Sequence, residues 1–76
     1  MPKLPVVLGR VVIAALRRAG FEVDRQEGSH VVMVHEDSGR IAVVPMHGGR
    51  DLPAGTVRKI LRQASLTVEE FVQLLR

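Results

Sequence analysis

The first apolar pattern along the chain repeats at spacings of three and four residues, as on one face of a helix. Its members are Leu8, Val12, Ala15, Leu16 and Ala19. Pro5 can open this helix, because proline is favoured in the first helical turn. Gly20 follows the last apolar position, where helices commonly end with a residue at positive φ. The pattern therefore predicts a helix that opens at Pro5 and stops at Gly20.

The next part of the chain changes to short runs with the period of two that is typical of strands. The predicted strands run from Phe21 to Arg25, from His30 to His35 and from Arg40 to Val44. A tight turn at Gly28 and a hairpin loop from Glu36 to Gly39 separate them, and Pro45 ends the third. Consecutive strands joined by such turns predict an antiparallel sheet.

The predicted strands differ in how many apolar faces they have. The first should turn Phe21 and Val23 inward and leave its charged residues in water. The second places Val31 and Met33 on one face and Val32 and Val34 on the other. A chain of 76 residues can cover only one face of this sheet with helices. We therefore expect the other face to be a docking surface.

Two further helices are expected after a glycine-containing loop. The apolar stripe of the first consists of Val57, Ile60, Leu61 and Ala64. Arg58, Lys59 and Arg62 fall on the opposite side, so this helix has a basic, solvent-facing surface. Thr67 and Glu70 have the spacing of a capping box, which opens the terminal helix. The element order predicts an α+β fold, α-β-β-β-α with a short C-terminal helix, in which helices cover one face of a three-stranded antiparallel sheet.

Composition narrows the class of protein. With 46% hydrophobic and 25% charged residues, the sequence is that of one globular domain, which we assign to residues 1–76. The absence of cysteine excludes disulfides and thiolate metal sites. The apolar runs near the N-terminus are too short and too interrupted to cross a bilayer and lack a small-residue cleavage site, so we expect a cytoplasmic protein.

Charge is distributed unevenly along the chain. The net charge is +3. Between Ser38 and Val68, the only acidic residue is Asp51. The basic residues of this stretch are Arg40, Arg50, Arg58, Lys59 and Arg62. An anionic partner is therefore expected to contact the second half.

The triplet Gly28-Ser29-His30 is the strongest candidate for chemistry, because it places an imidazole where a turn becomes a strand. By itself a histidine beside a glycine turn is a weak signal, and an ordinary strand-start histidine is the simpler interpretation. The basic helix favours metal-free RNA cleavage instead. In that reaction His30 acts as general base or acid, Ser29 is a phosphate or orienting donor, and Arg58 and Lys59 stabilise charge on the phosphate.

The remaining candidates concern metal and RNA binding. His30 and His35 are five residues apart in one strand and so point to opposite faces, which argues against a metal site. His35 is interpreted as a solvated strand end, whereas His47 could equally be a surface histidine or a second catalytic group. Thr56 opens a helix whose free N–H groups can receive a phosphate. The predicted RNA-binding residues are Arg50, Thr56, Arg58, Lys59 and Arg62. With no tyrosine or tryptophan, recognition should involve backbone and shape.

Several short motifs together resemble the HicA family of bacterial toxins. They are Gly20-Phe21, Gly28-Ser29-His30, Pro45-Met46-His47-Gly48, Gly55-Thr56-Val57-Arg58-Lys59-Ile60-Leu61 and Glu69-Glu70-Phe71. The resemblance implies a fold similar to the double-stranded RNA-binding domain, cleavage of mRNA that stops translation, and a HicB-type antitoxin. It also implies that His30 is the catalytic residue and that Pro45 and His47 match the proline-x-histidine motif of the family. Ser65 departs from the family, whose members often have glycine there.

Two other interpretations remain beside this one. The first is a non-catalytic RNA-binding module on the same fold. The second is a small protein that acts only as a subunit of a complex, through the apolar outer face of its sheet. In the favoured interpretation the chain needs no cofactor, and it is a monomer alone or a hetero-oligomer with its antitoxin.

Overall fold

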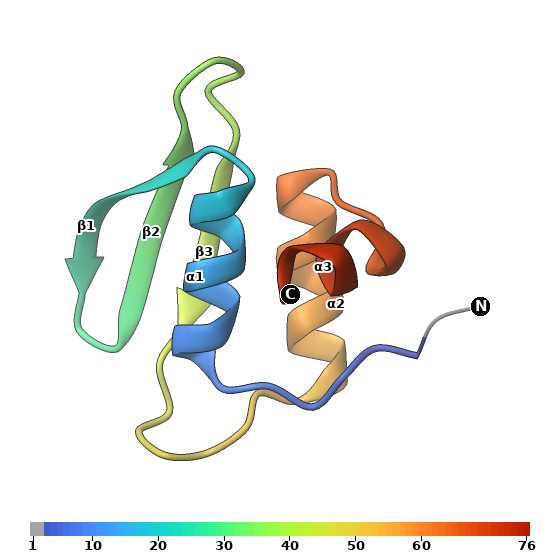
Figure 1. Cartoon of the computed structure of the whole chain (residues 1–76). Helices are drawn as coiled ribbons and strands as arrows, with labels where there is room; N and C mark the ends of the chain where they lie inside the picture. The colour runs from blue at the N-terminus through green and yellow to red at the C-terminus, as the bar shows by residue number, and fades with distance from the viewer. Residues whose placement is uncertain (1–2) are drawn as a thin grey trace.

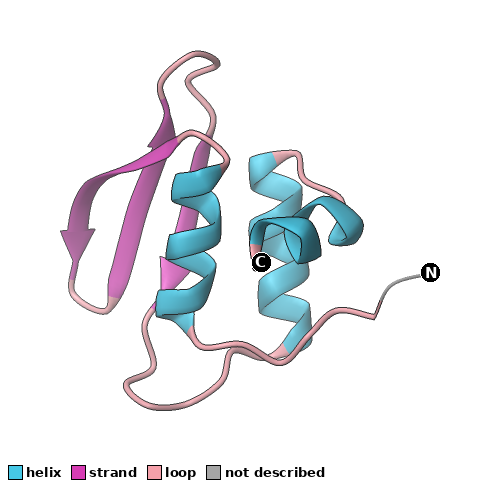
Figure 2. Ribbon diagram, viewed as in Figure 1, coloured by secondary structure: helices cyan, strands magenta, loops and turns pink. Residues whose placement is uncertain are grey.

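The computed structural model describes residues 3–76, so the first two residues of the predicted 1–76 domain lie outside the described part. The elements are α1 (Gly9–Arg18), β1 (Phe21–Glu27), β2 (His30–His35), β3 (Ile41–Pro45), α2 (Ala54–Ala64) and α3 (Val68–Leu74). The strands form one antiparallel sheet in the order β1-β2-β3. Helices α1 and α2 lie on the same side of this sheet, and α3 packs against both (Figures 1 and 2). The predicted α+β fold is confirmed.

One core lies between the sheet and the helices. Its buried side chains include Val12, Leu16, Phe21, Val31, Met33, Val44, Val57, Ile60, Leu61 and Phe71. All four members of the predicted α2 stripe are buried, and the Thr67–Glu70 capping box is present in both directions. The periodicity of the sequence therefore identifies the buried faces of these helices.

Helix α1 begins at Gly9, so the prediction that it opens at Pro5 is wrong. The chain before Gly9 is held by a distant segment instead. The backbone carbonyl of Val7 accepts a hydrogen bond from the N–H of Leu52 at 2.9 Å, and Leu8 forms an antiparallel bridge with Asp51. Val7 also joins the core. This pairing consumes the backbone groups that a longer helix would need.

Strand β1 also differs from its prediction. Val23 pairs with Met33 on the helix-facing side, yet it is 39% exposed, so its predicted inward position is wrong in part. The reason is that β1 is an edge strand that runs away from α1 (Figure 1). A bulge between Val23 and Arg25 then shifts the register, and β1 continues to Glu27. Strand β3 begins at Ile41, one residue later than expected.

Helix α2 ends in the conformation that is usually reserved for glycine. Ser65 has φ +56°, and it is the only non-glycine residue with positive φ among residues 3–76. Its N–H donates to the carbonyl of Arg62, and the N–H of Leu66 donates to that of Leu61. These two bonds form a Schellman motif. Helix α2 therefore ends at this position even though residue 65 is a serine and not the glycine that is common in the family.

Candidate active site

A two-residue turn positions His30. Gly28 is the first residue of the turn and has φ +58°, as in a type II′ hairpin. His30 then opens β2, paired with Glu27 on one side and Pro45 on the other. The carbonyl of Ser29 accepts a hydrogen bond from the N–H of Met46 at 2.6 Å, which ties the turn to the end of β3. A rigid ladder therefore holds the exposed imidazole.

His30 and one face of α2 line a common cavity of about 170 Å³. Its lining residues are His30, Val43, Pro45, Thr56, Lys59, Ile60 and Gln63. The four that belong to α2 recur at spacings of three and four, so they share one helix face. The cavity combines an imidazole, a hydroxyl, an ammonium group and an amide over an apolar floor. These groups can transfer a proton and stabilise the negative charge of a phosphate.

Gln63 joins this cavity to the edge of the sheet. Its Oε1 accepts a hydrogen bond from the backbone N–H of Val43 at 3.0 Å. Gln63 was not among the site residues predicted from the sequence. Its position four residues after Lys59 and seven after Thr56 places it on the same helix face, and this spacing was the available signal.

The structure brings together only some of the predicted site residues. Thr56 and Lys59 line the His30 cavity, and Ser29 lies in the adjoining turn. Arg58 and Arg62 are exposed on a neighbouring sector of α2, as predicted, and are not part of the cavity lining. His47 and Arg50 lie in the loop after β3. They line a second cavity of about 320 Å³ with Asp51 and Pro53.

Comparison with known families agrees with these motifs. Residues 9–66 match the family model described as the HicA toxin of bacterial toxin-antitoxin systems. The chain belongs to the HicA toxin family. The matched residues run from the start of α1 to just beyond α2 and contain every residue that lines the His30 cavity. A search of curated proteins finds no match to the chain.

The third histidine of this HicA-family chain has a structural role. The ring of His35 contacts Phe21 edge-on, with the ring centroids 5.1 Å apart. Its Nδ1 accepts a hydrogen bond from the N–H of Ser38 at 3.2 Å. His35 is half-buried by these contacts, so its interpretation as a solvated strand end is wrong. Within residues 3–76, no three histidine, aspartate or glutamate side chains gather closely enough to hold a metal ion.

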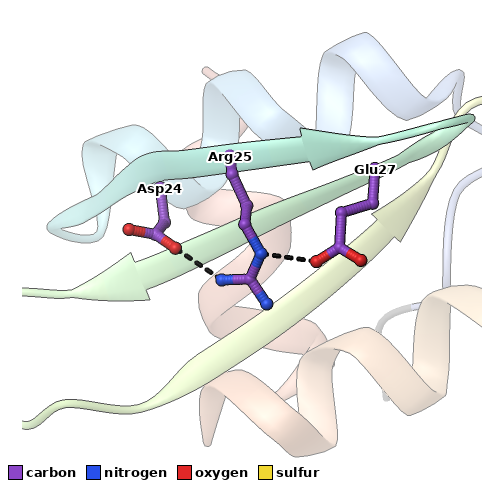
Figure 3. Close-up of polar contacts among 3 residues, drawn as sticks. All are labelled: Asp24, Arg25 and Glu27. Atoms are coloured by element: carbon purple, nitrogen blue, oxygen red, sulfur yellow. Dashed lines mark hydrogen bonds and ion pairs between the residues drawn. The ribbon is translucent and has the colours of Figure 1, made fainter.

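The sheet face away from the helices also carries His30. The outward-facing apolar residues of β2 and β3 are Val32, Val34, Ile41 and Val43. Arg25 lies across this face, between the carboxylates of Asp24 and Glu27 (Figure 3). Val32 pairs with Arg25 and is only 6% exposed.

Arg25 also changes the charge near His30. Hydrogen bonds to the carboxylates of Glu27 and then Asp24 raise the pKa of Arg25 above its ordinary value. Glu27 is the cross-strand neighbour of His30, so the guanidinium partly offsets negative charge beside the imidazole. A polyanion meets less repulsion here than the two carboxylates alone would produce.

The helices of the HicA-family chain are short. The longest of those described, α2, has 11 residues. No helix among residues 3–76 has both the length and the apolar character needed to cross a membrane.

Proposed function

We propose that this HicA-family toxin is an endoribonuclease that cleaves mRNA in the cytoplasm without a metal ion and so stops translation. The observation that carries the proposal is the cavity in which His30, Thr56 and Lys59 meet. A free imidazole ordinarily titrates at about pH 6.5, so this type of side chain can accept and release protons under cellular conditions. Carboxylates in the same place would be repelled by the phosphates of RNA.

The reaction needs one proton to leave and one to arrive. The 2′-hydroxyl oxygen attacks the adjacent phosphorus, its proton passes to a base, and the bond from phosphorus to the 5′ oxygen breaks as that oxygen is protonated. His30 is the general base or acid of this step. Lys59 and Thr56 stabilise the charge that develops on the phosphate, and Ser29 orients the incoming strand.

The other basic residues fit a role in binding. Arg58 and Arg62 are exposed on α2 and can contact phosphates on either side of the cleaved bond. His47 lies with Arg50 in a separate cavity, which favours contact with a neighbouring phosphate over proton transfer at the phosphate held beside His30. RNA is then held mainly through its backbone, because the two aromatic residues, Phe21 and Phe71, are in the core.

A HicB-type antitoxin is the proposed partner, in a hetero-oligomer with a chain that is monomeric alone. The face that carries His30 also exposes apolar side chains of β2 and β3, including Ile41, which is 55% exposed. The basic surface of α2 offers a target for acidic side chains, which speeds association. A partner that covers both regions excludes RNA from the site.

Cleavage by purified His30→Ala protein tests the proposal. We expect it to lose cleavage and growth arrest by at least about a hundredfold, as when a general base or acid is removed. Its stability should change by less than about 0.5 kcal/mol, because the side chain is exposed. His47→Ala is the comparison variant: it removes an exposed imidazole outside the cavity, so it should weaken RNA binding without abolishing cleavage. Equal cleavage by wild type and His30→Ala would remove His30 from catalysis, and RNA binding without cleavage by the wild type would favour the non-catalytic module.

A further inference from the structure

The outer edge of β3 needs a partner for its backbone donors. Among residues 3–76, β3 has a neighbouring strand, β2, on one side only, so its other side is an edge of the sheet. Pro45 has no N–H to leave unpaired. Val43 has one, and it donates to Oε1 of Gln63 at 3.0 Å. Gln63 therefore acts as a substitute for a fourth strand at this position.

This hydrogen bond fixes the orientation of the Gln63 amide. A backbone N–H can only donate, so the atom that faces it must be the amide oxygen. The Nε2 group, with two donor hydrogens, then occupies the other branch of the amide. This is the one hydrogen bond of the Gln63 side chain in the described chain. The described residues contain no buried, unpaired side-chain nitrogen, so Nε2 is accessible to solvent.

The same side chain lines the His30 cavity beside Lys59. At about 170 Å³, this cavity is well below the roughly 300–1,000 Å³ of pockets that enclose whole small-molecule ligands. It is suited to a phosphate group with its sugar oxygens, while the attached bases remain outside.

We propose that Gln63 is a phosphate-binding residue of this site, donating from Nε2 to a non-bridging oxygen of the phosphate that lies beside His30. The inference rests on the proposed function, because that function supplies the RNA. The bond from Val43 holds the amide before RNA arrives, so little side-chain entropy is lost when the phosphate binds. The contact is independent of base sequence.

Two reciprocal substitutions separate this role from simple capping of the strand edge. Gln63→Glu keeps an oxygen for the N–H of Val43 but removes both donors. Gln63→Lys keeps a donor for the phosphate but removes the acceptor for Val43. Each changes the charge, so each is compared with the same substitution at Gln73, which is exposed on α3. The quantity compared is kcat/KM, because losing a contact with the phosphate lowers kcat/KM even where kcat is unchanged, and the Gln73 variants measure the general effect of charge on binding.

The proposal predicts that Gln63→Glu lowers kcat/KM at least about tenfold relative to Gln73→Glu. Gln63→Lys should remain within about threefold of Gln73→Lys, which is less than the effect of one hydrogen bond. The opposite pattern would show that Gln63 only caps β3, and unchanged kcat/KM in both variants would remove it from the site. A changed choice of cleaved sequence in Gln63→Glu would also overturn the proposal, since it would indicate a contact with a base.

A spectroscopic readout distinguishes failure of this inference from failure of the proposed function. In ¹⁵N-labelled His30→Ala protein, the side-chain amide signals of Gln63 should shift when a short single-stranded RNA is added, and those of Gln73 should not. If the wild type fails to cleave RNA but these signals shift, the proposed function fails and the inference stands. If the wild type cleaves RNA and the signals do not shift, the inference alone is wrong.

Discussion

Replacing Gly20 with alanine should destabilise the fold through two separate effects. Gly20 has φ +99°, a conformation that residues with a Cβ rarely adopt. An added Cβ would also lie 2.8 Å from Nε2 of His35. The His35 ring has little freedom to move away, because it packs against Phe21 and accepts a hydrogen bond from Ser38. Gly20→Ala therefore combines backbone strain with an overpacked contact.

The two effects have comparable sizes. A non-glycine residue in a rare backbone conformation costs about 1–3 kcal/mol. Forcing an extra methyl group against packed atoms costs about 1–3 kcal/mol. Gly39 provides the matched control, because it has φ +73° and nothing within 4 Å of its added Cβ. Gly39→Ala should show the strain alone, and Gly20→Ala should exceed it by the cost of the contact with His35.

Urea unfolding measures the difference. The chain has no tryptophan or tyrosine, so far-UV circular dichroism is the appropriate signal. We expect a lower midpoint for Gly20→Ala than for Gly39→Ala at an unchanged m value. In a double-mutant cycle, His35→Ala should recover the part of the loss that the contact causes. Equal losses at Gly20 and Gly39, or additivity in the cycle, would refute the packing of His35 on Gly20.

The remaining predictions concern the end of α2, its charges and the partner. Ser65→Gly should raise the free energy of unfolding by about 1 kcal/mol, because glycine adopts φ +56° without strain; an unchanged urea midpoint would contradict this. Lys59→Gln should reduce cleavage more than Arg58→Gln, while each lowers the salt slope of RNA binding by about one; equal losses of cleavage would place the two side chains in the same role. Purified HicB-type antitoxin and a non-cleavable RNA should compete for His30→Ala protein, and simultaneous binding with unchanged affinities would show that the antitoxin binds elsewhere.

The sequence predicted those parts of the fold that depend on residues close together in the chain. The helical stripe of Val57, Ile60 and Leu61 is buried as expected. Gly20 has positive φ and follows the end of α1, as its position after the last apolar residue predicted. The start of α1 could not be predicted, because it depends on the pairing of Val7 with Leu52, far away in the sequence. The bulge in β1 likewise depends on its partner strand, which the alternation of a single strand does not reveal.

The candidate site was predicted as a set of residue types but not as an arrangement. The sequence identified His30, Thr56 and Lys59, which share a cavity, and also His47, which lies in a second cavity. Only the path of the loop after β3 shows that His47 lies in a different cavity from His30. Gln63 was missed because a glutamine on a helix is ordinarily a solvated residue. Its specific partner is the N–H of Val43, which points away from β2 at the edge of the sheet.

The chemical identity of the RNA ends tests the central claim most directly. Purified wild-type protein is incubated with single-stranded RNA in the presence of EDTA, and the product ends are determined. Attack by the 2′-hydroxyl predicts a 2′,3′-cyclic phosphate on one product and a 5′-hydroxyl on the other, no cleavage at a 2′-deoxy position, and no products from His30→Ala protein. Intact RNA under these conditions, cleavage restored by a divalent ion, or products with 5′-phosphate ends would contradict a metal-free mechanism based on His30.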